Sequence, residues 1–355
     1  MRLADLFPFI LLSLCAAMAS APLLIRAAGR MHLVDLPGSA PHKSHRAPTP
    51  MAGGLILASA IGIAYGVMRP SLDTQILGIL IGAGWMTIWG TLDDRHNLRP
   101  YQKLLAQVAA SVLLIFMGVQ VQATRLVGID ILLTLLWVVG LTNAFNFVDS
   151  MDGLALGLAG IASAFFMLVT IDSAQPGLAA LSATILGATV GAFIYNASPA
   201  RTFLGDSGSQ LLGFLLSAIG IAYTPAQAGL PQELTWFTPI LVLGVPIFDM
   251  VLVVYARLRN GRPVFVGGQD HTYHRLHALG LDATRSVLAM QLCGILLGLV
   301  AFVLLDFPVL IANAVFAAVA VGGVVLIYLL ERQILLASPG ASDRERGDFH
   351  RGEGA

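Results

Sequence analysis

The stretch LTNAFNFVDSMDGLALG, residues 141–157, places regularly spaced polar side chains between two long apolar runs. Its amides and carboxylates recur at every third residue, at Asn143, Asn146, Asp149 and Asp152. Residues three apart are neighbours on a helix, so the first three predict one polar edge, and the following Gly153 is typical of a helix end. Polar groups beside apolar segments are expensive in a membrane, which indicates a functional site here.

The composition of the whole chain is that of a membrane protein. Of 355 residues, 57% are hydrophobic and 11% are charged, with a mean hydropathy of +0.81, whereas a soluble domain carries about 25% charged residues. The net charge of zero gives no reason to expect a nucleic-acid partner. Cys15 and Cys293 lie inside apolar runs and form neither a disulfide framework nor a metal-binding pattern. We expect one transmembrane domain over residues 1–332 and a disordered tail over 333–355.

Apolar segments recur from one end of the chain to the other. They lie at about 6–25, 51–68, 76–92, 104–120, 130–148, 154–171, 178–197, 211–224, 237–255, 287–305 and 309–330. Backbone polar groups must be satisfied internally in lipid, so these segments are predicted to be helices. The expected fold is therefore an all-α, polytopic membrane protein with about eleven transmembrane helices.

The basic residues orient this arrangement. With eleven spans, 17 of the 20 Lys and Arg residues fall on one side, and only Arg2, Arg69 and Arg125 fall on the other. The positive-inside rule then places the amino terminus outside and the carboxyl terminus in the cytoplasm. The sequence AAMASA in the first segment resembles a signal-peptide cleavage site. Its basic residues follow the apolar run instead of preceding it, which favours an uncleaved helix.

Unusual polar stretches collect on the predicted cytoplasmic side. They are DLPGSAPHKSHRAPTPMAGG (35–54), GTLDDRHNLRPYQK (90–103), NAFNFVDSMDGL (143–154), FLGDSGSQ (203–210) and RNGRPVFVGGQDHTYHRL (259–276). A secondary transporter would place ionisable groups near the bilayer midplane, often in inverted repeats, and no repeat is evident. The clustering at helix ends favours an enzyme over a transporter.

Each stretch has a functional and a structural interpretation. The adjacent Asp93 and Asp94 suit a cation, or they are a solvated helix end; the nearby Lys103 favours function. The amides and carboxylates of 143–152 suit a hard cation or a base such as uracil, whereas contacts between helices would explain Asn143 alone. Asp206, between two glycines, suits Mg²⁺ and a diphosphate, or it belongs to an ordinary turn.

The last stretch carries cationic side chains. His271, His274 and Arg275 suit phosphate oxygens, whereas Arg257 and Arg259 are explained equally well as positive-inside charge. The absence of a cysteine partner makes zinc a poor fit. Together these residues predict Mg²⁺-assisted chemistry between a water-soluble phosphate compound and a lipid phosphate.

These motifs, in this order, resemble those of a known family, the polyprenyl-phosphate N-acetylhexosamine-1-phosphate transferases. The similarity runs from DLPGSAPHKSHRAPTPMAGG to DHTYHRL and is strongest to the undecaprenyl-phosphate N-acetylglucosaminyl-1-phosphate transferase branch. The resemblance implies transfer of a sugar-1-phosphate from a UDP-N-acetyl sugar to undecaprenyl phosphate, with release of UMP. It also implies an enzyme of the bacterial inner membrane whose active site faces the cytoplasm and which begins a cell-surface glycan such as O-antigen.

The resemblance assigns roles to individual residues. It makes Asp206 the main ligand of Mg²⁺, with Mn²⁺ as a substitute, and puts Asp149 close to the metal or the diphosphate. Asp93 and Asp94 would meet the lipid phosphate, with Asp93 the better candidate for a base. The remaining implied roles fall into three sets: nucleotide contacts by Asn146 and Asp152; phosphate contacts or lid ordering by Lys103, His271, His274 and Arg275; and a basic first loop with Lys43, His45 and Arg46.

Two departures from the family pattern bear on the donor sugar. Tyr273 stands where the family has the first of two adjacent histidines, and Met51 follows Pro50 where the family often has arginine. N-acetylglucosamine is the expected sugar, and another UDP-N-acetyl sugar is the alternative. Direct attack by the lipid phosphate and double displacement through an aspartyl-phosphate both agree with these residues. Membrane lipid is an expected partner, and the family often forms homodimers, although the spans themselves do not indicate one.

Overall fold

The computed structural model describes residues 2–37, 47–124, 126–223, 236–263, 268 and 270–337, with side chains as far as 332. Of the described residues, 79% are helical, which confirms the predicted all-α class. The elements, in chain order, are η1 (Leu3–Leu6), α1 (Phe7–Arg30), β1 (Val34–Asp35), β2 (Thr49–Pro50), α2 (Gly53–Met68), α3 (Thr74–His96), α4 (Pro100–Phe116), α5 (Val127–Val148), α6 (Leu154–Asp172), α7 (Pro176–Asn196), α8 (Gly205–Ala222), α9 (Thr238–Val242), α10 (Gly244–Arg259), α11 (Thr272–Ala278), α12 (Ala283–Val303), η3 (Leu304–Asp306) and α13 (Val309–Ala337).

Each predicted apolar segment falls mostly on helix in its described residues, although some extend a few residues past the helix end. In the described part of the chain, seven helical segments are long and apolar enough to cross a membrane, and α2 and α4 are shorter apolar helices. The predicted segment 237–255 is two helices, α9 and α10, which meet at Leu243. Pro246 has no N–H to donate to the carbonyl of Val242, which explains the break. Helix α13 continues to Ala337, past the predicted start of a disordered tail.

Helix α8 is the centre of the bundle. It packs mainly against α3 and α5, and nearly all of its residues are buried. Glycines on the neighbouring helices permit this close packing. A Cβ on Gly90 of α3 would lie 2.4 Å from the Cα of Ser207, and one on Gly54 of α2 would lie 2.5 Å from the backbone nitrogen of Gly208. The backbones around the start of α8 are therefore in direct contact.

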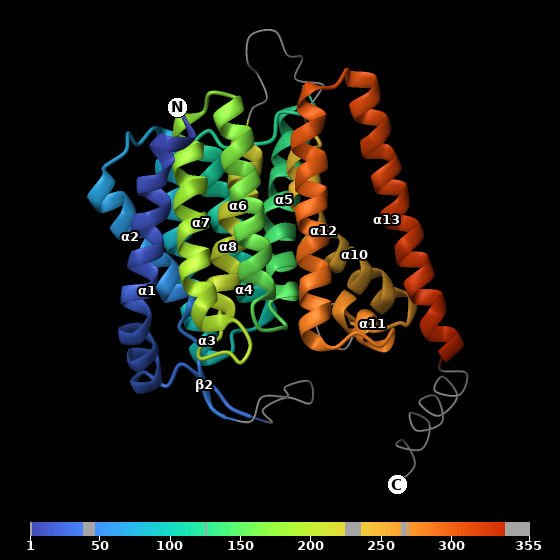
Figure 1. Cartoon of the computed structure of the whole chain (residues 1–355), viewed down its shortest axis with the longest axis horizontal. Coiled ribbons are helices and arrows are strands. Elements are labelled where there is room, and N and C mark those ends of the chain that lie inside the picture. Colours follow the sequence, from blue (N-terminus) through green and yellow to red (C-terminus); the bar gives the residue numbers. More distant parts are fainter. Residues whose placement is uncertain are drawn as a thin grey trace.

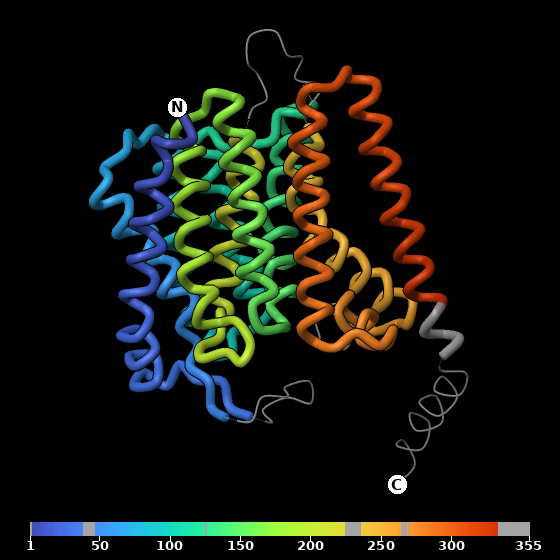
Figure 2. Tube along the Cα trace, in the orientation of Figure 1, coloured from blue at the N-terminus to red at the C-terminus, as the bar shows by residue number. Residues whose placement is uncertain are grey.

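The carboxyl-terminal helices stand to one side of this centre. In Figures 1 and 2, the orange and red helices α12 and α13 lie beside the bundle, and α10 and α11 fill the space at their lower end. The most apolar window of α13 is 11% buried, compared with 72% for α6 and for α7. Its exposed Leu310 and Val324 are suited to contact with lipid.

The first loop is attached to the segment that leads into α8. Strands β1 and β2 form an antiparallel pair, and Met51 then bridges to Phe203 in parallel. The first N–H groups at α2 are satisfied there: Ala52 donates to Oγ1 of Thr202 at 3.1 Å, and Gly53 and Gly54 donate to the carbonyls of residues 203 and 204 at 3.0 and 3.2 Å. This loop thus fixes the chain immediately before Asp206.

Candidate active site

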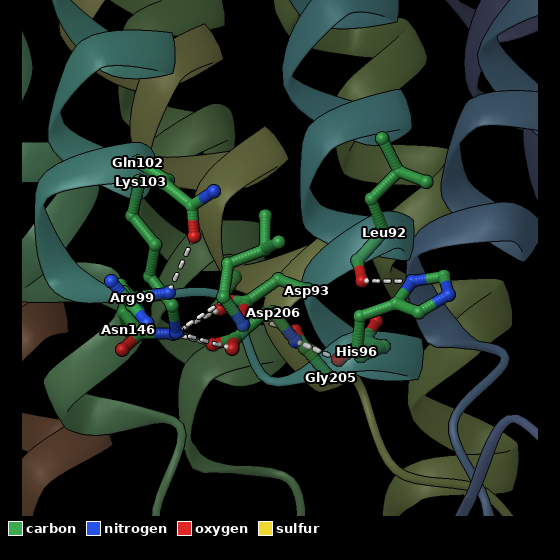
Figure 3. A network of polar contacts seen from close by, with 12 residues as sticks. Leu92, Asp93, His96, Arg99, Gln102, Lys103, Asn146, Gly205 and Asp206 are labelled. Atoms are coloured by element: carbon green, nitrogen blue, oxygen red, sulfur yellow. Dashed lines mark hydrogen bonds and ion pairs between the residues drawn. The ribbon is translucent and has the colours of Figure 1, made fainter.

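Asp206, in the first turn of α8, joins two other helices, α4 and α5, through its carboxylate (Figure 3). Nζ of Lys103, on α4, donates to Oδ2 at 2.9 Å. Nδ2 of Asn146, near the end of α5, donates to Oδ1 and also to Oγ of Ser209 at 3.0 Å. Residues from three predicted motifs therefore meet at the amino end of one buried helix.

Asp93 belongs to the same network. Its side chain is 2% exposed and forms an ion pair with Lys103, so the ammonium lies between the carboxylates of Asp93 and Asp206. Oδ1 of Asp93 accepts the N–H of Leu98 at 2.8 Å, which fixes the turn between α3 and α4. A buried carboxylate is costly without a counter-charge, and Lys103 offsets that cost for both carboxylates.

Asp94 is turned toward the backbone of α8. Its Oδ1 accepts the N–H of Asp206 at 2.7 Å, and its Oδ2 accepts the N–H of Ser207 at 3.1 Å. The first N–H groups of a helix lack partners within the helix, so Asp94 caps α8 from α3. Gly205 makes this approach possible, because its φ is +71° and a Cβ there would lie 2.8 Å from Oδ2 of Asp94.

Asp149 and Asp152 lie in the turn between α5 and α6. Asp149 caps α5 and is half-buried. Burial, together with the charges of Asp206, Asp94 and Asp152, raises the pKa of Asp149 well above its ordinary value. Oδ2 of Asp152 accepts the N–H of Ala200 at 3.1 Å, which brings this turn against the segment before α8.

The turn is supported from both sides. Gly153, with φ +75°, begins α6 and donates its N–H to Oδ1 of Asn196 at 3.0 Å. Asn143, one turn earlier in the polar edge, donates to Oε1 of Gln107 on α4 at 2.8 Å. Asn143 therefore makes the contact between helices that the structural interpretation predicted for it.

The carboxylates at this end of the bundle fit a hard cation chemically. Their donors are oxygens, and Mg²⁺ is usually held by one or two carboxylates together with substrate phosphates and water. Within the described ranges, no three or more His, Cys, Asp or Glu side chains form a ready metal cage. A metal here would therefore depend on oxygens that the substrate brings.

The last motif reaches the same turn from the carboxyl-terminal side. Nδ1 of His271 and Oδ2 of Asp249 are 2.9 Å apart, and the N–H of Thr272 donates to Oδ1 of Asp249 at 2.7 Å. The His271 ring lies edge-on to Phe147, with 5.9 Å between the ring centroids. Tyr273, which stacks on His271, hydrogen-bonds Ser150. The motif therefore borders the turn that carries Asp149.

The other cationic residues of this motif face different partners. Arg275 pairs with Glu331 on α13 at 2.7 Å, and both side chains are 7% exposed. Burial, together with the neighbouring His271, lowers the pKa of His274 to about 4. Arg257 is buried, pairs with Asp270 at 3.2 Å and lies over the ring of Phe147, so positive-inside charge does not describe it.

Sequence reasoning missed Asp249 and Glu331. Both were visible as carboxylates inside or at the end of apolar segments, in GVPIFDMVLVV and VLIYLLE, where an ionisable group is expensive. The predicted basic residues of the first loop, Lys43, His45 and Arg46, lie outside the described residues.

Comparison with known proteins agrees with this geometry. The sequence profile of glycosyl transferase family 4 matches residues 76–224, which contain the Asp93, Asn146 and Asp206 network. The probable undecaprenyl-phosphate N-acetylglucosaminyl 1-phosphate transferase of Bacillus subtilis is 32% identical over 308 residues, 83% of each chain. The decaprenyl-phosphate N-acetylglucosaminephosphotransferase of Mycobacterium tuberculosis is 32% identical over 73% of this chain and 72% of its own.

A third relative covers a similar length. The undecaprenyl-phosphate alpha-N-acetylglucosaminyl 1-phosphate transferase of Escherichia coli is 26% identical over 77% of this chain and 76% of its own. The identity to the Bacillus and Mycobacterium proteins extends over more than two thirds of this chain and far beyond the residues of any single motif. The chain therefore belongs to the polyprenyl-phosphate N-acetylhexosamine-1-phosphate transferase family.

Proposed function

We propose that this protein transfers N-acetylglucosamine-1-phosphate from UDP-N-acetylglucosamine to undecaprenyl phosphate, giving the lipid diphosphate sugar and UMP. The observation that carries the proposal is the convergence of Asp93, Lys103, Asn146 and Asp206 at the amino end of α8. The activities for which the relatives are named support both the sugar phosphate and the polyprenyl phosphate. The product would begin a cell-surface glycan.

Asp206 and Asp149 are the residues that would hold Mg²⁺. When bound, the ion would draw negative charge from the diphosphate of the donor. Lys103 supplies a second positive charge beside Asp206, at a distance of 2.9 Å from its Oδ2. Asp93 holds that ammonium in place, and Asp94 holds the backbone of Asp206. These residues position charges in advance, which is the main contribution of a protein to phosphoryl transfer.

The reaction balances without a separate proton donor. An oxygen of the lipid phosphate forms a bond to the phosphorus that carries the sugar. The bond from that phosphorus to the bridging oxygen breaks, and its electron pair leaves with UMP. Because the lipid phosphate is already ionised at neutral pH, a general base is not required. In-line placement of the two phosphates by the cationic residues would then lower the barrier.

We further propose that all eleven apolar segments cross the bacterial inner membrane, with the amino terminus outside. The split of basic residues supports this orientation. Figure 1, in which α1 begins and α13 ends at opposite ends of the bundle, agrees with an odd number of crossings. The network around Asp206 then faces the cytoplasm, where nucleotide sugars are available. A homodimer is also proposed, from the resemblance alone.

The test is release of labelled UMP by purified protein with undecaprenyl phosphate and a panel of UDP-sugars, with Mg²⁺, with Mn²⁺ and with a chelator. We expect metal-dependent release with UDP-N-acetylglucosamine. Release with another UDP-N-acetyl sugar alone would keep the reaction class and replace the donor. Absence of release with every donor, from folded protein supplied with lipid phosphate, would contradict the proposal.

A further inference from the structure

Among the described residues, the carboxylate of Asp249 makes its hydrogen bonds to one short segment of the chain. The residue lies on α10 among Phe248, Met250 and Val251, and it is 1% exposed. Its two oxygens contact the ring of His271 at 2.9 Å and the N–H of Thr272 at 2.7 Å. A buried carboxylate is costly, and among the described residues the compensating hydrogen bonds come from residues 271 and 272.

These contacts determine which nitrogen of His271 carries a proton. A carboxylate accepts hydrogen bonds and cannot donate, so Nδ1 of His271 must be the donor. The second nitrogen, Nε2, makes no hydrogen bond with any described residue. The side chain keeps 10% exposure, so the ring is enclosed without being sealed off. The free nitrogen is thus the one available to a ligand.

Two aromatic side chains hold the ring beside the turn between α5 and α6. Phe147 meets it edge-on, with 5.9 Å between centroids, and Tyr273 stacks on it at 5.8 Å. Tyr273 is itself hydrogen-bonded to Ser150, the residue after Asp149. His271 is therefore held beside the segment that carries a proposed metal ligand.

We propose that Asp249 is a positioning residue for the transferase reaction: it fixes the orientation of the His271 ring and stabilises its protonated form, so that Nε2–H donates to a phosphate oxygen of the bound substrate. The proposal rests on the proposed function. In its protonated form, His271 donates from Nδ1 to Asp249 and from Nε2 to the phosphate, so the imidazolium bridges two anions. No bond to phosphorus is made or broken by either residue.

The decisive variant is Asp249→Asn, which keeps the size and the acceptor for Thr272 but presents an amide N–H₂ to His271. The favoured tautomer then reverses, with the proton on Nε2, and the bridging imidazolium loses its anionic partner. We expect kcat to fall about tenfold to a hundredfold, while KM for the UDP-sugar changes less, as when outer partners of a functional histidine are removed. Asp282→Asn, an exposed amino-terminal cap of α12, is the matched control and keeps wild-type kcat.

A double-mutant cycle separates positioning from general support of the fold. In a His271→Gln background, Asp249→Asn should cause no further loss, because the group on which it acts is gone. A loss of the same size in both backgrounds would overturn the proposal. Asp249→Glu keeps a carboxylate and should recover part of the activity lost in Asp249→Asn; activity no higher than that of Asp249→Asn would also count against it.

The ¹⁵N signals of histidine-labelled protein give a readout that needs no turnover. The His271 resonances, assigned by their loss in His271→Gln, should report Nδ1–H in the wild type and in Asp249→Glu, and Nε2–H in Asp249→Asn. Wild-type protein that shows Nε2–H would overturn the positioning proposal. Absence of transferase activity together with the Nδ1–H signal would instead contradict the proposed function and leave the Asp249–His271 hydrogen bond standing.

Discussion

Two regions of this molecule hold their polar groups in place by different kinds of contact. Around the start of α8, backbones touch: a Cβ on Gly90 would lie 2.4 Å from Ser207, and Asp94 bonds directly to the N–H groups of α8. In the carboxyl-terminal region, α10, α11 and α13 are joined by side-chain pairs, Asp249 with His271 and Arg275 with Glu331.

The two regions should therefore differ in how easily they rearrange. Packed backbones leave no room for adjustment, so the geometry around Asp206 is fixed as soon as the helices pack. Side-chain ion pairs can separate while each helix stays intact, so we expect α11 to detach from its neighbours at a lower free-energy cost. Substitutions in the first region should therefore affect fold and catalysis together, whereas those in the second should loosen α11 selectively.

The largest expected effect is that of Asp206→Asn. This change removes the charge that pairs with Lys103 and the proposed metal ligand, so transfer should fall by about 10³-fold or more, as when preorganised charges are lost from other active sites. UMP release with saturating substrates measures the effect, and chromatographic behaviour in detergent checks insertion. Turnover close to wild type would show that Asp206 is not a metal ligand and that the region around the start of α8 is not the catalytic centre.

The second-largest expected effect tests the ion pair between Arg275 and Glu331. Glu331→Leu leaves the guanidinium of Arg275 buried without its partner, which should destabilise the docking of α11 on α13 by about 3 kcal/mol. Hydrogen exchange should accelerate in α11 and at the end of α13 but not in α8. Adding Arg275→Met should restore most of the protection. Equal acceleration in α8 would show that the two regions are one cooperative unit.

A smaller effect tests the close packing of α8. Gly90→Ala places a methyl group against the Cα of Ser207 and should lower the free energy of unfolding by about 1–3 kcal/mol. Gly84→Ala is the matched control on the same helix, since nothing lies within 4 Å of a Cβ there, and it should be neutral or slightly stabilising. Thermal unfolding in detergent compares them, and equal midpoints would contradict the packing argument.

The smallest effect concerns pH. The pKa of His274 is about 4 in the folded protein, below the value of about 6.5 expected in an unfolded segment. The unfolded form therefore takes up a proton first, and the stability of α11 should fall as pH decreases from about 6.5 to about 4. Because His274 is half-exposed, we expect a loss below about 1 kcal/mol.

Exchange rates of the α11 amides at pH 7 and pH 5 measure this dependence. His274→Gln should flatten it, whereas His277→Gln, a change at an exposed histidine of the same helix, should leave it unaltered. A pH dependence that persists unchanged in His274→Gln would assign it to another group.

The sequence predicted which residues form the site better than it predicted how they are arranged. Lys103, Asn146 and Asp206 converge as the shared chemistry of their motifs suggested. The separate roles of Asp93 and Asp94 were not predictable, because adjacent residues on α3 face different partners only once α4 and α8 are placed. Such partners lie more than a hundred residues away for Asp94, and local patterns carry no information about them.

The helix pattern has similar limits. Apolar segments located the helices, but a run of apolar residues does not distinguish a continuous helix from α9 and α10 meeting at Leu243. Asp249 carried a usable signal, a carboxylate inside an apolar run. The role of Asp249 could not be predicted, because it depends on His271, which lies beside it only once α11 has packed against α10.

The attachment of the first loop to residues 202–204 has a consequence for biosynthesis. The contact from Ala52 to Thr202 spans 150 positions of the chain. A nascent polypeptide can insert α2 before residues 202–204 have been synthesised. Until then, the first N–H groups of α2 lack the acceptors that they have in the folded protein. The loop can close only after the helices from α3 to α7 have been made. Completion of the Asp206 turn is therefore a late event of assembly, and partially synthesised chains remain catalytically silent.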